Sequence, residues 1–264
     1  MPNIPEIHLP SQEIFTISGL SVSNTMLATL VTSALLLVMT IVIRRKAGLI
    51  PSRPQMMMEL IMDYFVDKLE IAFGDKERAM KAFPLIFTLF LFLLVANQFT
   101  LLPFMESIIT ADGVNVFRTP TSDYSLPIAL TILVWVISHV LALSISPLRH
   151  IGNFIKIEGF FKIRKLKDVP MAFLDFFLGL MDIVGEVAKL ASLSTRLFGN
   201  IFAGEVIVAI ISGLMIYTQY LVPIPFLGLS VLAGLVQAFV FAMLSILYIS
   251  SALNGVRPPE QSTV

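Results

Sequence analysis

A single arginine in an apolar stretch is the residue of this sequence with the clearest chemical content. Arg196 lies within LASLSTRLFGNIFAGE, residues 190–205, with apolar side chains on both sides. An arginine at the centre of a bilayer costs about 2.5–3.5 kcal/mol on insertion scales, so this position needs a physical reason. The nearest acids along the chain, Glu186 and Glu205, are not at the i±3 or i±4 spacing that pairs residues on a helix. We therefore expect the partner of Arg196 to lie outside its own helix.

The chemistry of the guanidinium group limits the role of Arg196. A guanidinium does not lose its proton in proteins, so it cannot pass protons along, but it can act as a fixed positive charge. At about 4 Å and an effective dielectric near 20, such a charge attracts a carboxylate by about 4 kcal/mol. A carboxylic acid brought beside Arg196 would therefore release its proton. The structural alternative is that Arg196 reaches the membrane interface or pairs with a carboxylate to hold the helices together.

Polar residues flank Arg196 on both sides and could line a path for ions: Asp182, Glu186 and Lys189 before it, and Asn200 and Glu205 after it. If this helix runs from the cytoplasm outward, the first three lie on the cytoplasmic side and the last two on the outer side. Glu205 then lies roughly 13 Å beyond Arg196 at 1.5 Å per residue. It also falls on the helix face opposite to Arg196 at 100° per residue. These positions predict two separate paths rather than one continuous path.

Three polar residues in other apolar segments are further candidates. Gln237 interrupts LAGLVQAFVF, where its amide needs a partner that Arg196 on an antiparallel helix could offer; the alternative is an interhelical hydrogen bond of packing value only. His139 lies deep in another apolar run, where it could serve a proton path or be held by the bundle. Asp123 precedes that run and could take up protons at its outer end, or be a solvated loop acid.

Composition places the chain in a membrane. Of its 264 residues 56% are hydrophobic and 14% are charged, against about 25% charged residues in soluble domains. The formal net charge is zero, which provides no basic surface for nucleic acid. The absence of cysteine excludes disulfides, and with three scattered histidines we expect no metal site and no cofactor. The first residues lack the pattern of a cleaved signal peptide.

Apolar runs long enough to cross a bilayer, about 20 residues each, recur along the chain. Residues 171–220 form a longer helical pattern whose charged first half indicates an oblique helix. The sequence thus predicts an all-α integral membrane protein with five transmembrane crossings, a long tilted C-terminal helical hairpin and one membrane-surface amphipathic helix. The expected segments are an outward segment at 1–24, spans at 25–46, 84–104, 126–148, 171–220 and 226–254, a surface helix and loop at 54–82, an outer loop at 105–125, a basic loop at 149–170 and a tail at 255–264.

Basic residues orient these segments, because cytoplasmic loops carry the excess of Lys and Arg. The segment before the first span has none, and the loop at 105–125 has only Arg118. The loops after the first and third spans are rich in Lys and Arg, and the tail has Arg257. We expect an outer N-terminus and a cytoplasmic C-terminus.

An amphipathic helix is predicted between the first two spans. In PQMMMELIMDYFVDKLEIAF, residues 54–73, acids recur at helical spacing opposite apolar side chains. Its polar face is acidic, whereas helices that bind lipid surfaces are usually basic. Docking against another subunit and lying on lipid are both open readings for a helix on the cytoplasmic surface.

Two motifs resemble subunit a of the F-type ATP synthase. They are Arg196-Leu-Phe-Gly-Asn-Ile-Phe-Ala-Gly-Glu205, and Gln237-Ala-Phe-Val-Phe with Tyr248. Asn97-Gln-Phe-Thr-Leu-Leu-Pro103 is similar to the family's Asn-x-x-Gly-Leu-Ile-Pro, with Thr100 in place of glycine, and Thr-Ser-Asp123 is similar to its Ser-Ala-Asp. The resemblance covers nearly the whole chain.

This resemblance implies a rotary mechanism. Two aqueous half-channels would meet a ring of c subunits, and Arg196 would be the gate between them. Glu205 and Asp123 would line the outer channel and Asp182 and Glu186 the inner one, and Asn200 and Gln237 would position Arg196. Lys189 and His139 are further candidates for the proton path, with no channel assigned to them. The implied partners are the c-ring, peripheral-stalk b subunits, the bilayer and H⁺, with Na⁺ left open, in a bacterial inner membrane. The chain has no GxxxxGK[ST] loop, so we expect no nucleotide site.

Two readings from other classes remain at this point. A stand-alone secondary transporter could use Arg196 to bind an anionic substrate; inverted repeats and broken helices would favour it, and the sequence shows neither. An assembly scaffold without an ion path is the other.

Overall fold

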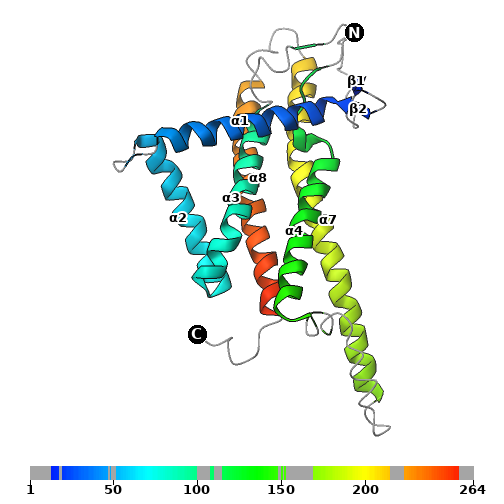
Figure 1. The fold of residues 1–264 in the computed structure, drawn as a ribbon. Coiled ribbons are helices and arrows are strands. Elements are labelled where there is room, and N and C mark those ends of the chain that lie inside the picture. Colours follow the sequence, from blue (N-terminus) through cyan, green and yellow to red (C-terminus); the bar gives the residue numbers. More distant parts are fainter. Residues whose placement is uncertain are drawn as a thin grey trace.

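Long helices form the body of the molecule in this computed structural model, which describes residues 13–17, 20–46, 48, 52–99, 108–109, 115–147, 150, 152, 169–214 and 223–255 (Figure 1). The helices are α1 (Asn24–Lys46), α2 (Arg53–Phe73), α3 (Lys76–Phe99), α4 (Ser125–Ile145), α7 (Val169–Leu214) and α8 (Pro223–Asn254), with a short 3₁₀ helix η1 (Pro120–Ser122) before α4. The strands β1 (Glu13–Ile17) and β2 (Leu20–Ser23) pair antiparallel before α1. The all-α prediction holds for the body, but this hairpin was not predicted.

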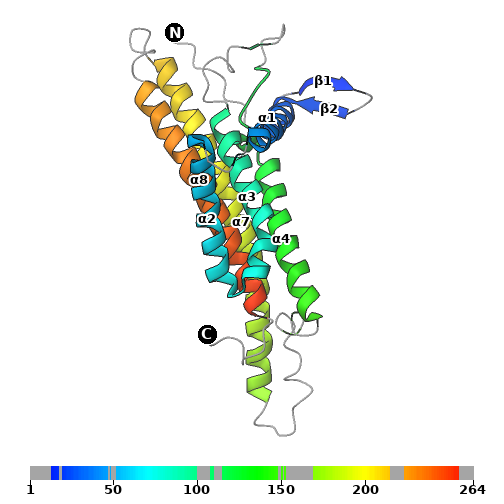
Figure 2. The same ribbon diagram turned by 60° about the vertical axis from the view of Figure 1, so that its left-hand side comes forward.

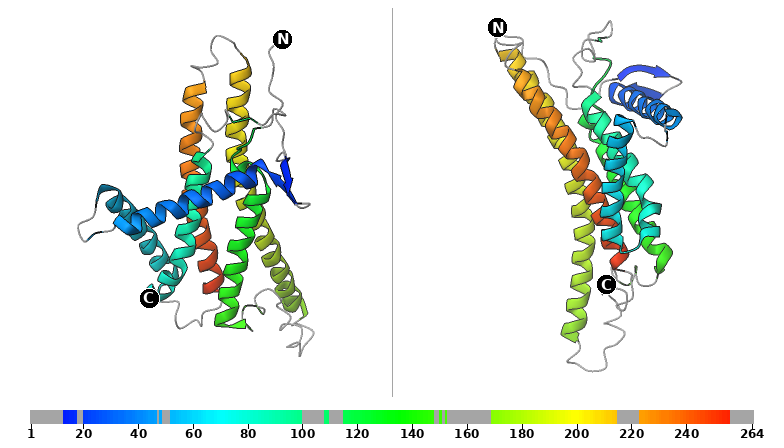
Figure 3. Two further views of the ribbon diagram at one scale, coloured as in Figure 1. Left: turned by 45° about the horizontal axis from the view of Figure 1, so that its top comes forward. Right: turned by 90° about the vertical axis from the view of Figure 1, so that its left-hand side faces the viewer.

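The helices lie in two layers crossed by α1. The long helices α7 and α8 lie side by side, and α2, α3 and α4 pack beside them (Figure 2). The first helix runs crosswise over α3, on the side away from α7 and α8 (Figure 3). The core between the layers includes Phe65 of α2, Leu93 of α3, Leu197 of α7 and Phe241 of α8, all at most 1% exposed.

The predicted amphipathic helix is present as α2. Pro54 stands in its first turn, and Gly74 ends it in the left-handed conformation (φ 62°), donating its N–H to the Glu70 carbonyl at 2.8 Å. Its buried face packs on α3 and α8 of the same chain, while the acids Asp63 and Asp67 face outward. The apolar face therefore has an internal partner, and its orientation to the membrane stays a prediction.

The helix that contains the second apolar run begins earlier than the predicted span at 84–104. Helix α3 starts at Lys76, so Pro84 lies inside the helix and not in its first turn. The Asp75 carboxylate accepts a hydrogen bond from the Glu77 N–H at 2.9 Å, which stabilises a helix start among charged residues. The start of the apolar run therefore does not mark the start of the helix.

Within the described residues, four helices are long and apolar enough to cross a membrane: Asn24–Arg45, Lys76–Gln98, Ser125–Ile145 and Ile224–Asn254. They correspond to four of the five predicted spans. Helix α7 is not among these four, so its crossing stays a prediction. At 1.5 Å per residue the 46 residues of α7 extend about 69 Å, more than twice a hydrocarbon core of about 30 Å.

Several predicted segments lie outside the described residues. These are the first twelve residues, most of the outer loop after α3, the basic loop at 153–168, the connection at 215–222 and the tail after residue 255.

Candidate functional site

Arg196 lies on the side of α7 that faces away from the bundle. Its side chain is exposed, whereas Leu193 and Leu197 on the neighbouring faces are at most 1% exposed. Ser192 and Thr195, which share the exposed face, are small. In the part of the chain that the structure describes, Arg196 makes neither an ion pair nor a hydrogen bond. The guanidinium is thus open to a partner, and the small neighbours allow a second helix to approach it closely.

The Gln237 amide bonds to Asn200 rather than to Arg196. Asn200 Nδ2 donates to Gln237 Oε1 at 2.7 Å, joining α7 to α8. Gln237 is 2% exposed, and its Nε2 has no acceptor among the described residues. Gln237 therefore contacts Asn200, one helical turn after Arg196, and a role of Gln237 in positioning Arg196 stays a prediction. The axial offset arises because α8 begins at Pro223, which places Gln237 opposite the turn that follows Arg196.

On one side of Arg196, Glu205 pairs with a residue from the loop before α4. Arg118 Nε and Glu205 Oε2 are 3.5 Å apart, and the two side chains are 16% and 28% exposed. Helix η1, whose three residues are buried, packs against α7 and holds this segment in place. Arg118 was not predicted as a site residue. It is the only basic residue of the loop 105–125, and this feature of the sequence could have identified it as a partner for an acid.

Asp123 lies next to η1, where it stabilises local structure. Its Oδ1 accepts hydrogen bonds from the N–H of Ser125 at 3.2 Å and from the Ser125 hydroxyl at 3.0 Å. Its Oδ2 accepts one from the Thr25 hydroxyl at 3.3 Å. Asp123 therefore holds the first residue of α4 and ties it to α1, which is a structural role. A role in proton uptake stays a prediction.

On the other side of Arg196, Glu186 pairs with its own helix. Lys189 Nζ donates to Glu186 Oε1 at 2.6 Å, an i,i+3 pair on α7. The same ammonium lies 5.8 Å from the centre of the Tyr248 ring on α8. Asp182, one turn earlier, is exposed. The structure thus brings Glu186 and Lys189 together and leaves Glu205 in a separate group.

His139 of α4 belongs to an aromatic group near Glu186. Its ring centre lies 4.4 Å from that of Trp135 and 5.1 Å from that of His150, and its Nδ1 is 3.2 Å from Ser138 Oγ. Burial lowers the pKa of His150 below its ordinary value, while the charge of Glu186 partly opposes this. His150 and Trp135 were not predicted as site residues, because their closeness to Glu186 depends on how α4 packs on α7.

Known proteins match this chain along most of its length. The family described as ATP synthase A chain matches residues 26–250. A relative from Moorella thermoacetica named ATP synthase subunit a is 31% identical over 248 residues, covering 94% of this chain and 99% of its own. Relatives with the same name from Desulfotalea psychrophila and Streptococcus gordonii are each 33% identical, covering 77% and 80% of this chain and 73% and 83% of theirs.

Proposed function

This chain belongs to the ATP synthase subunit a family, and from that premise we propose that it forms two ion half-channels against a c-ring and gates proton transfer with Arg196. As a subunit a it is a membrane stator subunit that works with other ATP synthase subunits. The proposal concerns the path of the proton and the residues that carry it.

The exposed, unpaired guanidinium of Arg196 is the observation that carries the gate. A charge that only held the bundle together would be paired inside it, and among the described residues Arg196 has no such pair. A c-ring carboxylate that approached the small-residue face of α7 would meet a fixed cation and lose its proton. The same cation would repel protons that moved directly between the two sides.

The two carboxylate groups on either side of Arg196 support separate half-channels. Glu205 with Arg118 would belong to the outer half-channel, and Asp123 lies on the same segment as Arg118. Glu186, Lys189 and His139, with the exposed Asp182, would belong to the inner one. Asn200 and Gln237 would hold the turn of α7 next to the gate.

The remaining assignments follow from charge and family. The Lys and Arg distribution supports an outer N-terminus and a cytoplasmic C-terminus. The bacterial relatives support a bacterial inner membrane. The acidic face of α2 is exposed and could contact peripheral-stalk b subunits. Catalysis of ATP formation would take place on other subunits.

Substitution of Arg196 tests the proposed gate. Arg196→Ala should abolish ATP-driven acidification of inverted vesicles and raise passive proton leak, while membrane insertion is retained because alanine inserts more easily than arginine. Arg196→Lys should also lose most pumping, since a desolvated ammonium can give up its proton. Both variants are compared with the wild type at matched subunit levels. Pumping by Arg196→Ala near the wild-type rate would show that Arg196 is not the gate.

A further inference from the structure

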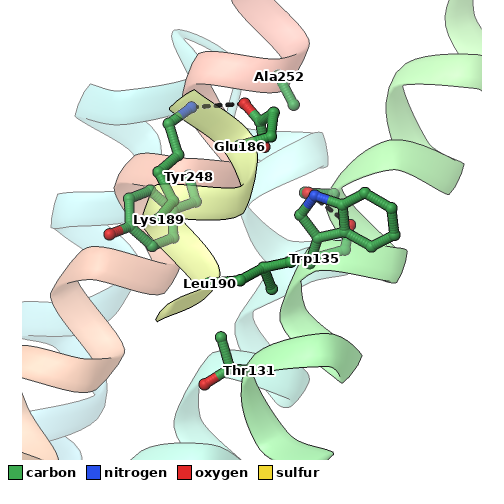
Figure 4. Close-up of a pocket in the computed structure, with 8 residues that line it drawn as sticks. Thr131, Trp135, Glu186, Lys189, Leu190, Tyr248 and Ala252 are labelled. Carbon is green, nitrogen blue, oxygen red and sulfur yellow. Dashed lines mark hydrogen bonds and ion pairs between the residues drawn. The ribbon is translucent and has the colours of Figure 1, made fainter. Parts of the chain in front are cut away.

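A cavity of about 20 Å³ lies between α4, α7 and α8, on the Glu186 side of Arg196 (Figure 4). Its polar lining consists of Thr131, Trp135 and Ser138 from α4, Glu186 and Lys189 from α7, and Tyr248 from α8. A cavity of about 10–15 Å³ is large enough for one water molecule when polar groups surround it. The space therefore fits one water.

The cavity borders a buried donor that lacks an acceptor. Trp135 Nε1 is buried, and no described residue accepts its hydrogen bond. In Figure 4 the indole nitrogen lies on the edge of the ring that faces α7, toward Glu186 and Leu190. Buried indole N–H groups usually have a partner, so this donor points to a molecule in the cavity.

The two hydroxyl groups that α4 contributes to the lining already use their donors within the protein. The hydroxyl of Thr131 donates to the Pro127 carbonyl at 2.8 Å, and the hydroxyl of Ser138 donates to the Trp135 carbonyl at 2.7 Å. Lys189 donates to only one oxygen of Glu186, which leaves the second oxygen able to accept. A water that accepts from Trp135 and donates to Glu186 satisfies both groups.

We propose that this cavity binds a water molecule which the Trp135 indole N–H orients, and that through this water Glu186 exchanges its proton with the cytoplasmic half-channel. The inference rests on the proposed function. When the water gives a proton to the Glu186 carboxylate, it takes another proton from the next water of the channel; when it receives a proton from the acid, it passes one on to that water. The indole keeps its own proton throughout, because Trp only donates, so Trp135 is a positioning residue.

Two variants test this proposal from opposite directions. Trp135→Phe keeps an aromatic ring and removes the N–H, whereas Ala252→Val adds carbon into the cavity and leaves Trp135 intact. Both should slow ATP-driven acidification of inverted vesicles roughly two- to tenfold, the range expected for the loss of one hydrogen-bonded link. Ala252→Val fills space, so a purely structural role of the cavity predicts unchanged or higher thermal stability with unchanged pumping.

The readouts are pumping rate at matched subunit levels and the thermal stability of the assembled complex. Thr32→Val is the matched control, since the Thr32 hydroxyl is also buried and has no partner among the described residues, but lies on α1. Slower pumping with unchanged stability in both test variants supports the proposal. Wild-type pumping in Ala252→Val, or in Trp135→Phe if Ala252→Val does not assemble, overturns it. That result would leave the Arg196 gate standing, which the Arg196→Ala measurement decides separately.

Discussion

The two carboxylates that flank Arg196 on α7 are held by cations of different origin. Glu205 meets Arg118, which comes from the loop before η1, so the pair exists only when that loop is folded against α7. Glu186 meets Lys189, which is three residues away on the same helix, so the helix alone brings the pair together. Tertiary structure holds Glu205, which we propose for the outer half-channel, while local geometry holds Glu186, proposed for the inner one, beside a cavity.

The surroundings of the two pairs differ in the same way. Around η1, hydrogen bonds connect three elements in series. Thr121 donates to Asn97 Oδ1 at 2.8 Å, and Asn97 donates to the Gly234 carbonyl at 3.2 Å. A Cβ atom at Gly234 would lie 3.1 Å from Asn97, so α3 and α8 approach closely there. Near Glu186 the packing leaves room for water instead. In the two half-channels proposed above, we therefore expect rigidity to limit proton transfer on the Glu205 side and hydration to limit it on the Glu186 side.

The largest effect is expected from breaking the ion pair of Arg118 and Glu205. Arg118→Gln leaves the largely buried Glu205 carboxylate without this cation, and we expect ATP-driven pumping to fall about tenfold or more. Arg118→Lys should recover part of the rate, because charge returns without the geometry of the guanidinium. Arg78→Gln, which removes an exposed ion pair with Asp75, serves as the control. Equal rates for Arg118→Gln and Arg78→Gln would contradict the comparison.

A smaller effect is expected from breaking the ion pair of Lys189 and Glu186. Lys189 is 36% exposed, and the cavity beside Glu186 can supply water to the carboxylate. We therefore expect Lys189→Gln to slow pumping only about two- to threefold. The measurement is acidification in inverted vesicles, in the same preparation as Arg118→Gln. A greater loss in Lys189→Gln than in Arg118→Gln would reverse the order proposed for the two sides.

The smallest expected effect concerns His150, which lies beside His139, and the pH dependence of thermal stability. Burial lowers the pKa of His150, so the unfolded chain binds a proton at a higher pH than the folded one does. The wild type should therefore lose stability as the pH falls through the ordinary pKa of histidine, about 6.5. His150→Gln should reduce this loss. Thermal unfolding of the complex at pH 5 and pH 7.5 measures it, and equal pH dependence in both proteins would count against the inference.

Most helices of this fold could be predicted, since their apolar runs are long and uninterrupted. The predicted spans at 126–148 and 226–254 lie within three residues of the helix bounds of α4 and α8. The start of α3 was missed because charged residues form its first two turns and Asp75 caps it. The hydropathy of a segment indicates whether lipid or water surrounds it. The start of a helix is indicated by its capping residues.

The candidate site was predictable only where neighbours along one helix decide it. The i,i+3 spacing of Glu186 and Lys189 was available from the sequence, whereas the pair of Arg118 and Glu205 required the fold of the loop. The position of Gln237 depended on the axial offset between α7 and α8, which no sequence pattern reports. Long-range pairs and helix offsets are properties of packing, and single-chain patterns do not contain them.

Helix α7 is one uninterrupted helix across Glu186, Arg196 and Glu205, so the chain cannot tolerate insertions or deletions between them as it can in a loop. One extra residue after Arg196 would turn Glu205 by about 100° and move it about 1.5 Å along the axis. The carboxylate would then no longer lie on the side of α7 that faces Arg118. Four extra residues would restore the face to within about 40° but displace the acid by about 6 Å. Length changes in this segment should therefore be rarer among functional variants than substitutions of its exposed residues.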